Sequence, residues 1–221
     1  ILVDDNSEDL TSRVEKIISG ITVIHNETNL LFLKNCNMAA KMAKGKYILL
    51  LNNDTQVQMN WLVPLVDLIE SKREIGMVGS KLIFPNGKLQ EAGGIIWCDA
   101  SAYNYGRGKS PDSPAFNFVR EVDYISGASI MILKSLWDEI GGFDERYHPA
   151  YYEDSDLAFE VRKHGKKVVY QPASEVVHFE GVSNGKNLDY GVKKYQNLNC
   201  NRFFAKWKKI LLAEQYQHKN I

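Results

Sequence analysis

The feature that most constrains the fold is an alternation of two hydrophobic periods along the first 54 residues. Short apolar runs typical of strands occur at residues 1–3, 21–24 and 46–51, and apolar residues at helical spacing fill both intervals between them. A strand–helix–strand–helix–strand order predicts a parallel sheet with right-handed crossovers. The third run is apolar on both faces, which is typical of a strand buried within such a sheet. We therefore predict an α/β fold, a mainly parallel sheet flanked by helices.

The rest of the chain continues this alternation less regularly. A length of 221 residues suits one ordinary domain, or one domain with a small appendage. Further helices are expected at residues 61–71, between Ser135 and Gly141, and at 152–163 and 188–216, and further strands at 75–84, 94–98, 116–125, 128–133, 167–170 and 176–178.

Composition removes several classes of protein. The 27 basic and 27 acidic residues balance, so the chain lacks the electrostatic footprint of a nucleic-acid-binding protein. Its 44% apolar and 24% charged residues are typical of a globular protein and exclude extensive disorder. The longest aliphatic run, residues 48–51, is too short to span a bilayer. Cys36, Cys98 and Cys200 form no CxxC pair, so we expect reduced thiols in a cytoplasmic protein.

Four polar clusters follow predicted strands or open predicted helices: Asp4–Asp5, Asn52–Asp54, Glu153–Asp154 and His178. Each cluster alone has a structural explanation, since such residues favour turns, helix caps and the first turn of a helix. Ligands of open parallel sheets bind outside the carboxyl ends of the strands. Because all four clusters fall in that position, we expect them to share one rim and form a binding site.

Other common site motifs are absent from the sequence. There is no GxGxxG, HExxH or GxSxG, so dinucleotide-binding, metalloprotease and serine-hydrolase interpretations lack support.

The ordered motifs resemble those of family 2 inverting glycosyltransferases. Residues 3–7 (VDDNS) and 43–55 (AKGKYILLLNNDT) resemble the nucleotide-binding half of that family. Residues 141–157, which contain GGFDE and YEDSDL, resemble its acceptor-side segment, and residues 177–181 (VHFEG) resemble its C-terminal histidine motif. The similarity covers about residues 1–182, and the NNDT form is similar to the rhamnosyltransferase-type members. The resemblance implies the glycosyltransferase-A fold.

On the donor side, the resemblance implies binding of a nucleoside-diphosphate sugar of the UDP or dTDP type. Asp5, with Asp4 beside it, would accept a hydrogen bond from the nucleotide base, and Asn53 would lie by the ribose. Asp54 would bind a divalent cation, Mn²⁺ or Mg²⁺, on the diphosphate, and His178 would approach the same metal. The cation would stabilise the charge of the leaving diphosphate.

On the acceptor side, Asp154 matches the family's catalytic base, and Glu153 lies beside it. The base would take the proton of the attacking hydroxyl, and a single displacement would invert the anomeric carbon. We expect the N-terminal position of Asp154 in its helix to keep the carboxylate ionised. The implied acceptor is a glycan or a lipid-linked acceptor of cell-envelope polysaccharide synthesis, which predicts a cytoplasmic protein with peripheral contact at the inner membrane face.

This interpretation divides the chain in two. Residues 1–182 form the predicted catalytic domain, with a nucleotide-binding part over about 1–84 and an acceptor-side part over about 85–182. Residues 183–221 form a mobile loop and a C-terminal helical region, and residues 182–187 are a candidate lid. The aromatic and basic residues of 202–209 leave two interpretations open: packing on the core, or contact with a membrane surface.

Three departures from the family pattern keep alternatives open. Asn52 stands where many members have a carboxylate, and residues 29–32 replace a glycine-rich stretch. The family's opening strand and helix do not appear, and the apolar start at Ile1 leads us to expect a segment of a longer protein. One alternative is therefore a non-catalytic carbohydrate- or nucleotide-binding domain on the same fold. Another is a nucleotidyltransferase, which would need a glycine-rich, arginine-containing triphosphate loop near the front that this segment lacks.

Overall fold

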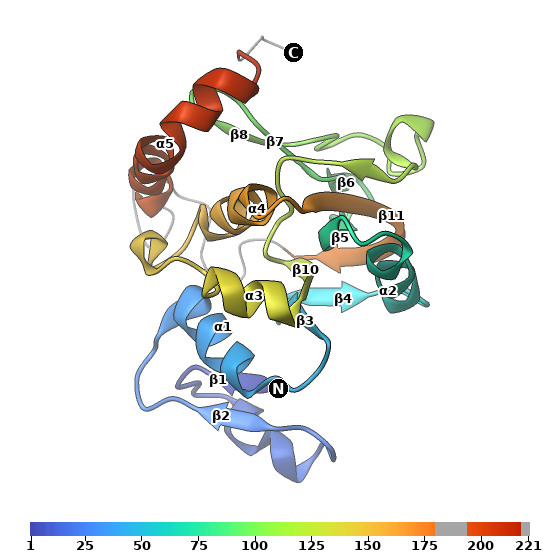
Figure 1. Cartoon of the computed structure of the whole chain (residues 1–221). Helices are drawn as coiled ribbons and strands as arrows, with labels where there is room; N and C mark the ends of the chain where they lie inside the picture. Colours follow the sequence, from blue (N-terminus) through green and yellow to red (C-terminus); the bar gives the residue numbers. More distant parts are fainter. Residues whose placement is uncertain (180–193, 218–221) are drawn as a thin grey trace.

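The computed structural model describes residues 1–179 and 194–217 and has an α/β architecture (Figure 1). The helices are α1 (Leu31–Met42), α2 (Leu62–Ser71), α3 (Lys134–Ile140), α4 (Glu153–Lys163) and α5 (Tyr195–Glu214), with 3-10 turns at Leu10–Lys16, Pro114–Phe116 and Glu145–Tyr147. The strands are β1 (Leu2–Asp4), β2 (Val23–His25), β3 (Tyr47–Leu51), β4 (Thr55–Val57), β5 (Ile75–Ile83), β6 (Leu89–Glu91), β7 (Gly94–Ile96), β8 (Ala102–Asn104), β9 (Arg120–Glu121), β10 (Ser129–Leu133) and β11 (Lys167–His178).

The strands form one large sheet and two small ones. The seven-stranded sheet has the order β3–β10–β5–β11–β4, with β6 beside β5 and β9 beside β11. β1 pairs with β2, and β7 pairs with β8, as separate two-stranded sheets. Figure 1 shows the β1–β2 sheet and α1 at one end of the molecule and α5 at the other, beside α4.

The α/β fold class is confirmed, but the large sheet is mixed. β11 runs parallel to β5, and β1 runs parallel to β2. β3 pairs antiparallel with β10, and among the described strands it does not pair with β1 or β2, so the prediction of one parallel sheet from the first three strands is wrong. In β3 the buried side chains alternate, with Ile48 and Leu50 inside and Leu51 43% exposed. Its uniform apolar sequence therefore does not reflect burial on both faces.

Two other strand predictions change in the structure. The short strands expected at 167–170 and 176–178 are parts of one twelve-residue strand, β11. A register shift against β5 between Gln171 and Glu175 interrupts its regular pairing, as a β-bulge does. The strand expected at 116–125 is only the two-residue β9. Because β11 continues past the bulge, its last residue, His178, pairs with Thr55 at the start of β4.

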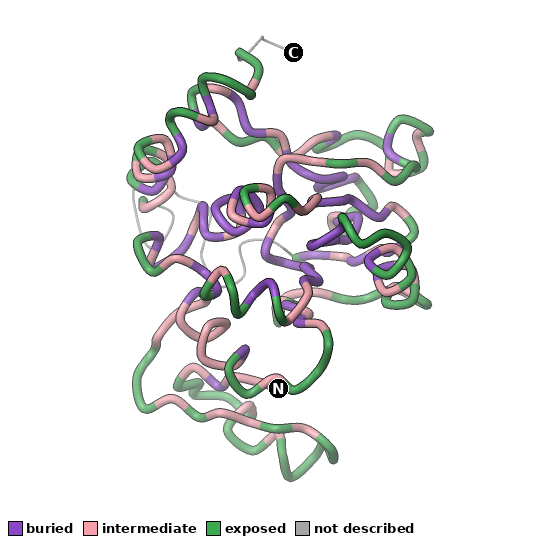
Figure 2. Tube along the Cα trace, in the orientation of Figure 1, coloured by how far each residue is buried: buried purple, intermediate pink, exposed green. Residues whose placement is uncertain are grey.

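Burial is concentrated in the large sheet and α4, and α5 buries one face, whereas the first thirty residues are largely exposed (Figure 2). Phe203, Trp207 and Leu211 of α5 are buried, and the Phe203 ring lies 4.9 Å from that of Phe159 in α4. These contacts confirm the interpretation that the C-terminal helix packs on the core. No helix within residues 1–179 and 194–217 combines the length and apolar character needed to cross a membrane.

Candidate functional site

Asp54 and His178 form the first half of the site. The pairing of β4 with β11 brings these two residues together. The His178 Nε2 atom lies 3.2 Å from Asp54 Oδ1, and the Phe179 amide donates to the Asp54 carbonyl at 2.9 Å. The hydrogen bond from His178 lowers the pKa of Asp54, so this carboxylate is ionised at neutral pH. His178 Nδ1 is buried without a hydrogen-bond partner among the described residues, so only Nε2 is engaged.

This pair fits a divalent cation but would not complete its coordination. Within the described part of the chain, no group of three or more His, Cys, Asp or Glu side chains is placed to hold a metal ion. A carboxylate oxygen together with an imidazole nitrogen suits Mn²⁺ better than Mg²⁺, which prefers oxygen ligands alone.

The loop before Asp54 connects this pair to the second half of the site. The Asn52 amide donates to the Ala128 carbonyl at 3.1 Å, and Thr55 Oγ1 donates to the Asn52 carbonyl at 2.6 Å. Asn53, predicted to lie by a ribose, is exposed. The end of β3 is therefore fixed directly against the loop that leads into β10, residues 126–128.

The same loop holds Asp154. The Gly127 amide donates to Asp154 Oδ2 at 3.0 Å, and the Ser155 amide donates to Oδ1 at 2.7 Å. Burial raises the pKa of Asp154, against these hydrogen bonds, whereas the helix N-terminus alone predicts a shift in the opposite direction. The pKa of Glu153 is raised well above its ordinary value, mainly by burial and secondly by the negative charge of Asp154. Glu153 Oε2 is buried with no partner among the described residues, so the neutral acid is favoured.

Phe32 of α1 forms another wall beside Asp154. A Cβ added at Gly127 would lie 3.2 Å from two atoms of the Phe32 ring and 3.9 Å from the Asp154 Cβ. Gly127 thus allows the ring, the loop and the carboxylate to meet. The sequence reasoning did not single out either residue, although Phe32 lies in the stretch that replaces the glycine-rich segment.

Asp4 and Asp5 lie at the end of β1 as predicted, but both carboxylates bind this chain's own groups. Asp4 accepts from the Ser7 amide at 3.0 Å and lies 3.0 Å from His25 Nδ1. Asp5 accepts from the amides of Leu30 at 2.7 Å and Leu31 at 2.9 Å, where α1 begins. Burial alone would raise the pKa of Asp5, but these hydrogen bonds and those from Asn side chains outweigh it, so the pKa is lowered. Recognition of a nucleotide base by Asp5 stays a prediction.

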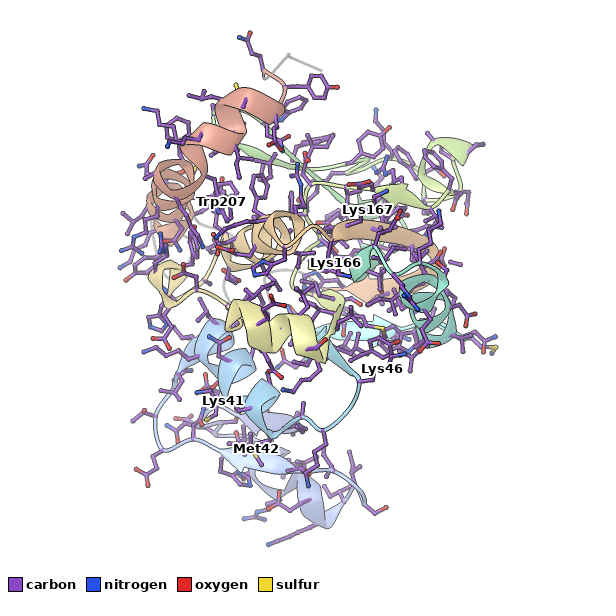
Figure 3. All side chains as sticks on the ribbon, in the orientation of Figure 1. Lys41, Met42, Lys46, Lys166, Lys167 and Trp207 are labelled. Atoms are coloured by element: carbon purple, nitrogen blue, oxygen red, sulfur yellow. The ribbon has the colours of Figure 1, made fainter. Side chains whose placement is uncertain are left out.

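A buried network behind Asp154 was missed because its members lie far apart in the sequence. Asp156 of α4 accepts from Trp207 Nε1 at 2.7 Å, Lys206 Nζ at 2.7 Å and the Tyr147 hydroxyl at 2.9 Å. Figure 3 shows Trp207 between α5 and α4. The sequence shows a cluster of acidic residues at the start of α4. The spacing of these residues does not reveal that Asp156, and not Asp154, binds Lys206.

The predicted donor-side and acceptor-side residues thus converge on the loop 126–128, through Asn52 from one side and Asp154 from the other. Asp5 reaches the same region indirectly, because it holds the start of α1, from which Phe32 extends to Gly127. The candidate lid at 182–187 lies outside the described residues.

Comparison with known proteins identifies the family and the fold of the chain. Residues 1–135 match the family model described as glycosyl transferase family 2. The chain is 31% identical over 153 residues to the O-antigen biosynthesis protein RfbC of Myxococcus xanthus, covering 66% of this chain and 12% of that protein. It is 40% identical over 68 residues to an N-acetylglucosaminyl-diphospho-decaprenol L-rhamnosyltransferase of Mycobacterium tuberculosis, covering 31% of this chain and 22% of that enzyme.

Solved structures show the same fold. The structure of GalNAc-T7 with UDP, GalNAc and Mn²⁺ matches with a TM-score of 0.71 and 19% identity, covering 93% of this chain and 41% of that one. The chain spans less than a quarter of the length of either curated relative. The fold is that of the glycosyltransferase-A enzymes, and because the family model matches well over half of its residues, the chain belongs to glycosyl transferase family 2.

Proposed function

We propose that this chain carries the catalytic site of an enzyme that transfers a sugar from a nucleoside diphosphate to an acceptor hydroxyl with inversion. The observation that carries the proposal is the loop 126–128, which holds the Asp154 carboxylate on one side and the Asn52 backbone on the other. The candidate base and the end of β3, two residues before Asp54, are therefore held by one short segment. Family membership supports glycosyl transfer as the chemistry of this chain.

Asp54 and His178 would hold the divalent cation, for which their oxygen and nitrogen atoms favour Mn²⁺. The cation would supply Lewis-acid stabilisation of the leaving diphosphate. Exposed Asn53 is free to contact the nucleotide portion of the donor. Asp5 accepts from the amides of Leu30 and Leu31 and from the Asn26 side chain, and the imide N–H of uracil or thymine would take the place of an asparagine donor.

Asp154 would take the proton from the acceptor hydroxyl. Its raised pKa brings the carboxylate closer to neutral pH, where general bases are most effective. The adjacent Glu153 is favoured as a neutral acid and is a poor candidate for a nucleophile. With one ionised carboxylate at the reacting face, a single displacement and inversion of the anomeric carbon follow. A lipid-linked glycan acceptor at the inner membrane face is the acceptor class that we propose, on the likeness to the rhamnosyltransferase.

Calorimetric titration of the intact protein with UDP and dTDP, with and without Mn²⁺, tests the donor side. We expect binding that requires Mn²⁺ and is lost in Asp54→Ala, and weaker binding of ADP than of UDP. Asp67→Ala, on α2, is the matched control for loss of a carboxylate. Metal-independent binding, or unchanged affinity in Asp54→Ala, would contradict the proposed metal site. Binding without any sugar transfer would favour the non-catalytic alternative.

A further inference from the structure

The backbone just before Asp154 adopts a conformation that tyrosine rarely takes. Tyr151 has φ 74° and Tyr152 has φ 72°, both in the left-handed region. Tyr152 directly precedes α4, and its side chain makes no capping hydrogen bond to the helix. Because bulky residues persist there only when their surroundings hold them, something must fix this turn.

The side chain of Asn199 on α5 contacts the backbone of this turn and of the segment before it. Its Nδ2 atom lies 2.8 Å from the Tyr147 carbonyl, 2.8 Å from the Ala150 carbonyl and 3.0 Å from the Tyr151 carbonyl. Asn199 is fully buried, and its Oδ1 accepts from Arg202 at 2.9 Å. One amide therefore joins three carbonyls of the segment that leads into Glu153 and Asp154.

This contact differs in kind from the other links between α5 and α4. Lys206 and Trp207 bind Asp156, two residues beyond Asp154, and connect one helix to the other. In the segment before α4, Asn199 Nδ2 contacts only backbone carbonyls, so it bears on the path by which the chain enters α4. Displacement of that path would move Asp154 relative to Gly127, whose amide lies on a different element.

We propose that Asn199 is a positioning residue for Asp154, acting through the left-handed turn at Tyr151–Tyr152. The inference rests on the proposed role of Asp154 as the base. Misplacement of a reacting group by about 1 Å costs on the order of 10²-fold in rate, so loss of this amide affects turnover without touching a donor ligand. Asn199 lies beyond residues 1–135, which the family model matches, so the proposed positioning contact comes from the part of the chain outside that match.

The test compares Asn199→Ala with Asn201→Ala in the intact protein, since Asn201 is an exposed asparagine on the same helix. The probe is UDP with Mn²⁺, whose calorimetric stoichiometry counts correctly folded donor sites. For Asn199→Ala we expect one site per chain, a donor Kd within about twofold of wild type, and a kcat per site lowered on the order of 10²-fold. A purely structural role would lower the stoichiometry and leave kcat per site unchanged. Asn199→Ser, which has a shorter donor, replaces the alanine variant if that variant does not fold.

Hydrogen exchange keeps the inference testable even if no transfer is found. Amides at 150–154 should exchange faster in Asn199→Ala than in Asn201→Ala, while those of α2 stay unchanged. Equal exchange in both variants, or an unchanged kcat per site in an active enzyme, overturns the role of Asn199. Full turnover in Asp154→Asn would instead overturn the proposed function and leave the exchange result to decide whether Asn199 holds the turn.

Discussion

The carboxylates at the two ends of the site lie in opposite environments. In the first thirty residues only Asp4 is buried, and Asp5 sits among hydrogen-bond donors that lower its pKa. In α4, seven of eleven residues are buried, and burial raises the pKa of both Glu153 and Asp154. The pKa of a carboxyl group is therefore lowered on the proposed donor side and raised on the acceptor side.

The difference reflects how each region is stabilised. The β1–β2 pair has few buried apolar side chains, so local hydrogen bonds such as those from Leu30 and Leu31 to Asp5 organise it. The α4–α5 region is held by aromatic packing and by the buried Asp156 network. Substitutions in the α4–α5 region should therefore mainly lower turnover and stability. Substitutions in the β1–β2 region should mainly disturb local order.

The largest expected effect is on turnover, in Asp154→Asn. This change keeps the shape of the side chain but removes the proton acceptor, so kcat should fall by about 10²–10⁴-fold while the affinity for UDP and Mn²⁺ stays unchanged. Steady-state kinetics with calorimetry would separate the two effects. Glu153→Gln, which substitutes an already neutral acid, should retain most activity. The reverse ranking would assign the base to Glu153.

The next largest effect is on stability, in Asp156→Ala. Removing this 2%-exposed carboxylate leaves the buried donors of Tyr147 and Trp207 unsatisfied, so the free energy of unfolding should fall by about 3 kcal/mol. Asp138→Ala on α3 is the matched control, because the partner of Asp138 is Lys134 and its side chain is 53% exposed. Its loss should stay under about 1 kcal/mol in denaturant titrations. Equal losses would remove the distinction between buried and exposed networks.

The pH dependence of stability should have opposite signs at the two ends. Glu153 binds its proton more tightly in the folded state, so it makes stability fall as pH rises above about 4, the ordinary range of a glutamate. Glu153→Gln should remove that slope and improve relative stability at neutral pH. Asp5 has a lowered pKa, so its contribution is present at neutral pH and is lost as pH falls through its folded pKa. Asp5→Asn should therefore lose stability at neutral pH and approach wild type in acid; parallel profiles for both variants would contradict the comparison.

The smallest expected effect concerns the backbone at the start of α1. Leu31 has φ 64°, a conformation that glycine adopts without strain, whereas the preceding Leu30 has φ −96°. Both glycine variants lose a partly buried leucine, but only Leu31→Gly relieves a left-handed residue. Leu31→Gly should be more stable than Leu30→Gly by about 1 kcal/mol in thermal or denaturant unfolding. An equal loss in both would show that the turn is not strained.

The local features of this fold could be predicted from the sequence, and the long-range pairings could not. Periodicity located α1, α2 and α4 to within about two residues, because apolar spacing on a helix is a local property. The apolar run of β3 predicted a strand but not its antiparallel partner β10, which follows almost eighty residues later. The sequence predicts two strands, 167–170 and 176–178, because the apolar pattern breaks at 171–175, where the structure has the bulge of β11.

The candidate site divides in the same way. Asp54 and Asp154, to which we assign the chemistry, stand in motifs, so the sequence predicts their positions. Gly127 contributes a backbone amide, and Asn199 binds backbone carbonyls from another helix, so neither leaves a motif in the sequence. Their contributions become visible only when the loop 126–128 and α5 are placed beside α4.

The central claim, one ionised base acting in a single displacement, is tested most directly by the anomeric configuration of the first product. The intact protein would be incubated with Mn²⁺ and UDP- or dTDP-sugars, and proton NMR would record the anomeric signal of the transferred sugar, or of the free sugar before it mutarotates. Our account predicts the configuration opposite to that of the donor, and its disappearance in Asp154→Asn. A product that keeps the donor's configuration would contradict the account, because it would require a second displacement through a nucleophile that this site does not offer among its described residues.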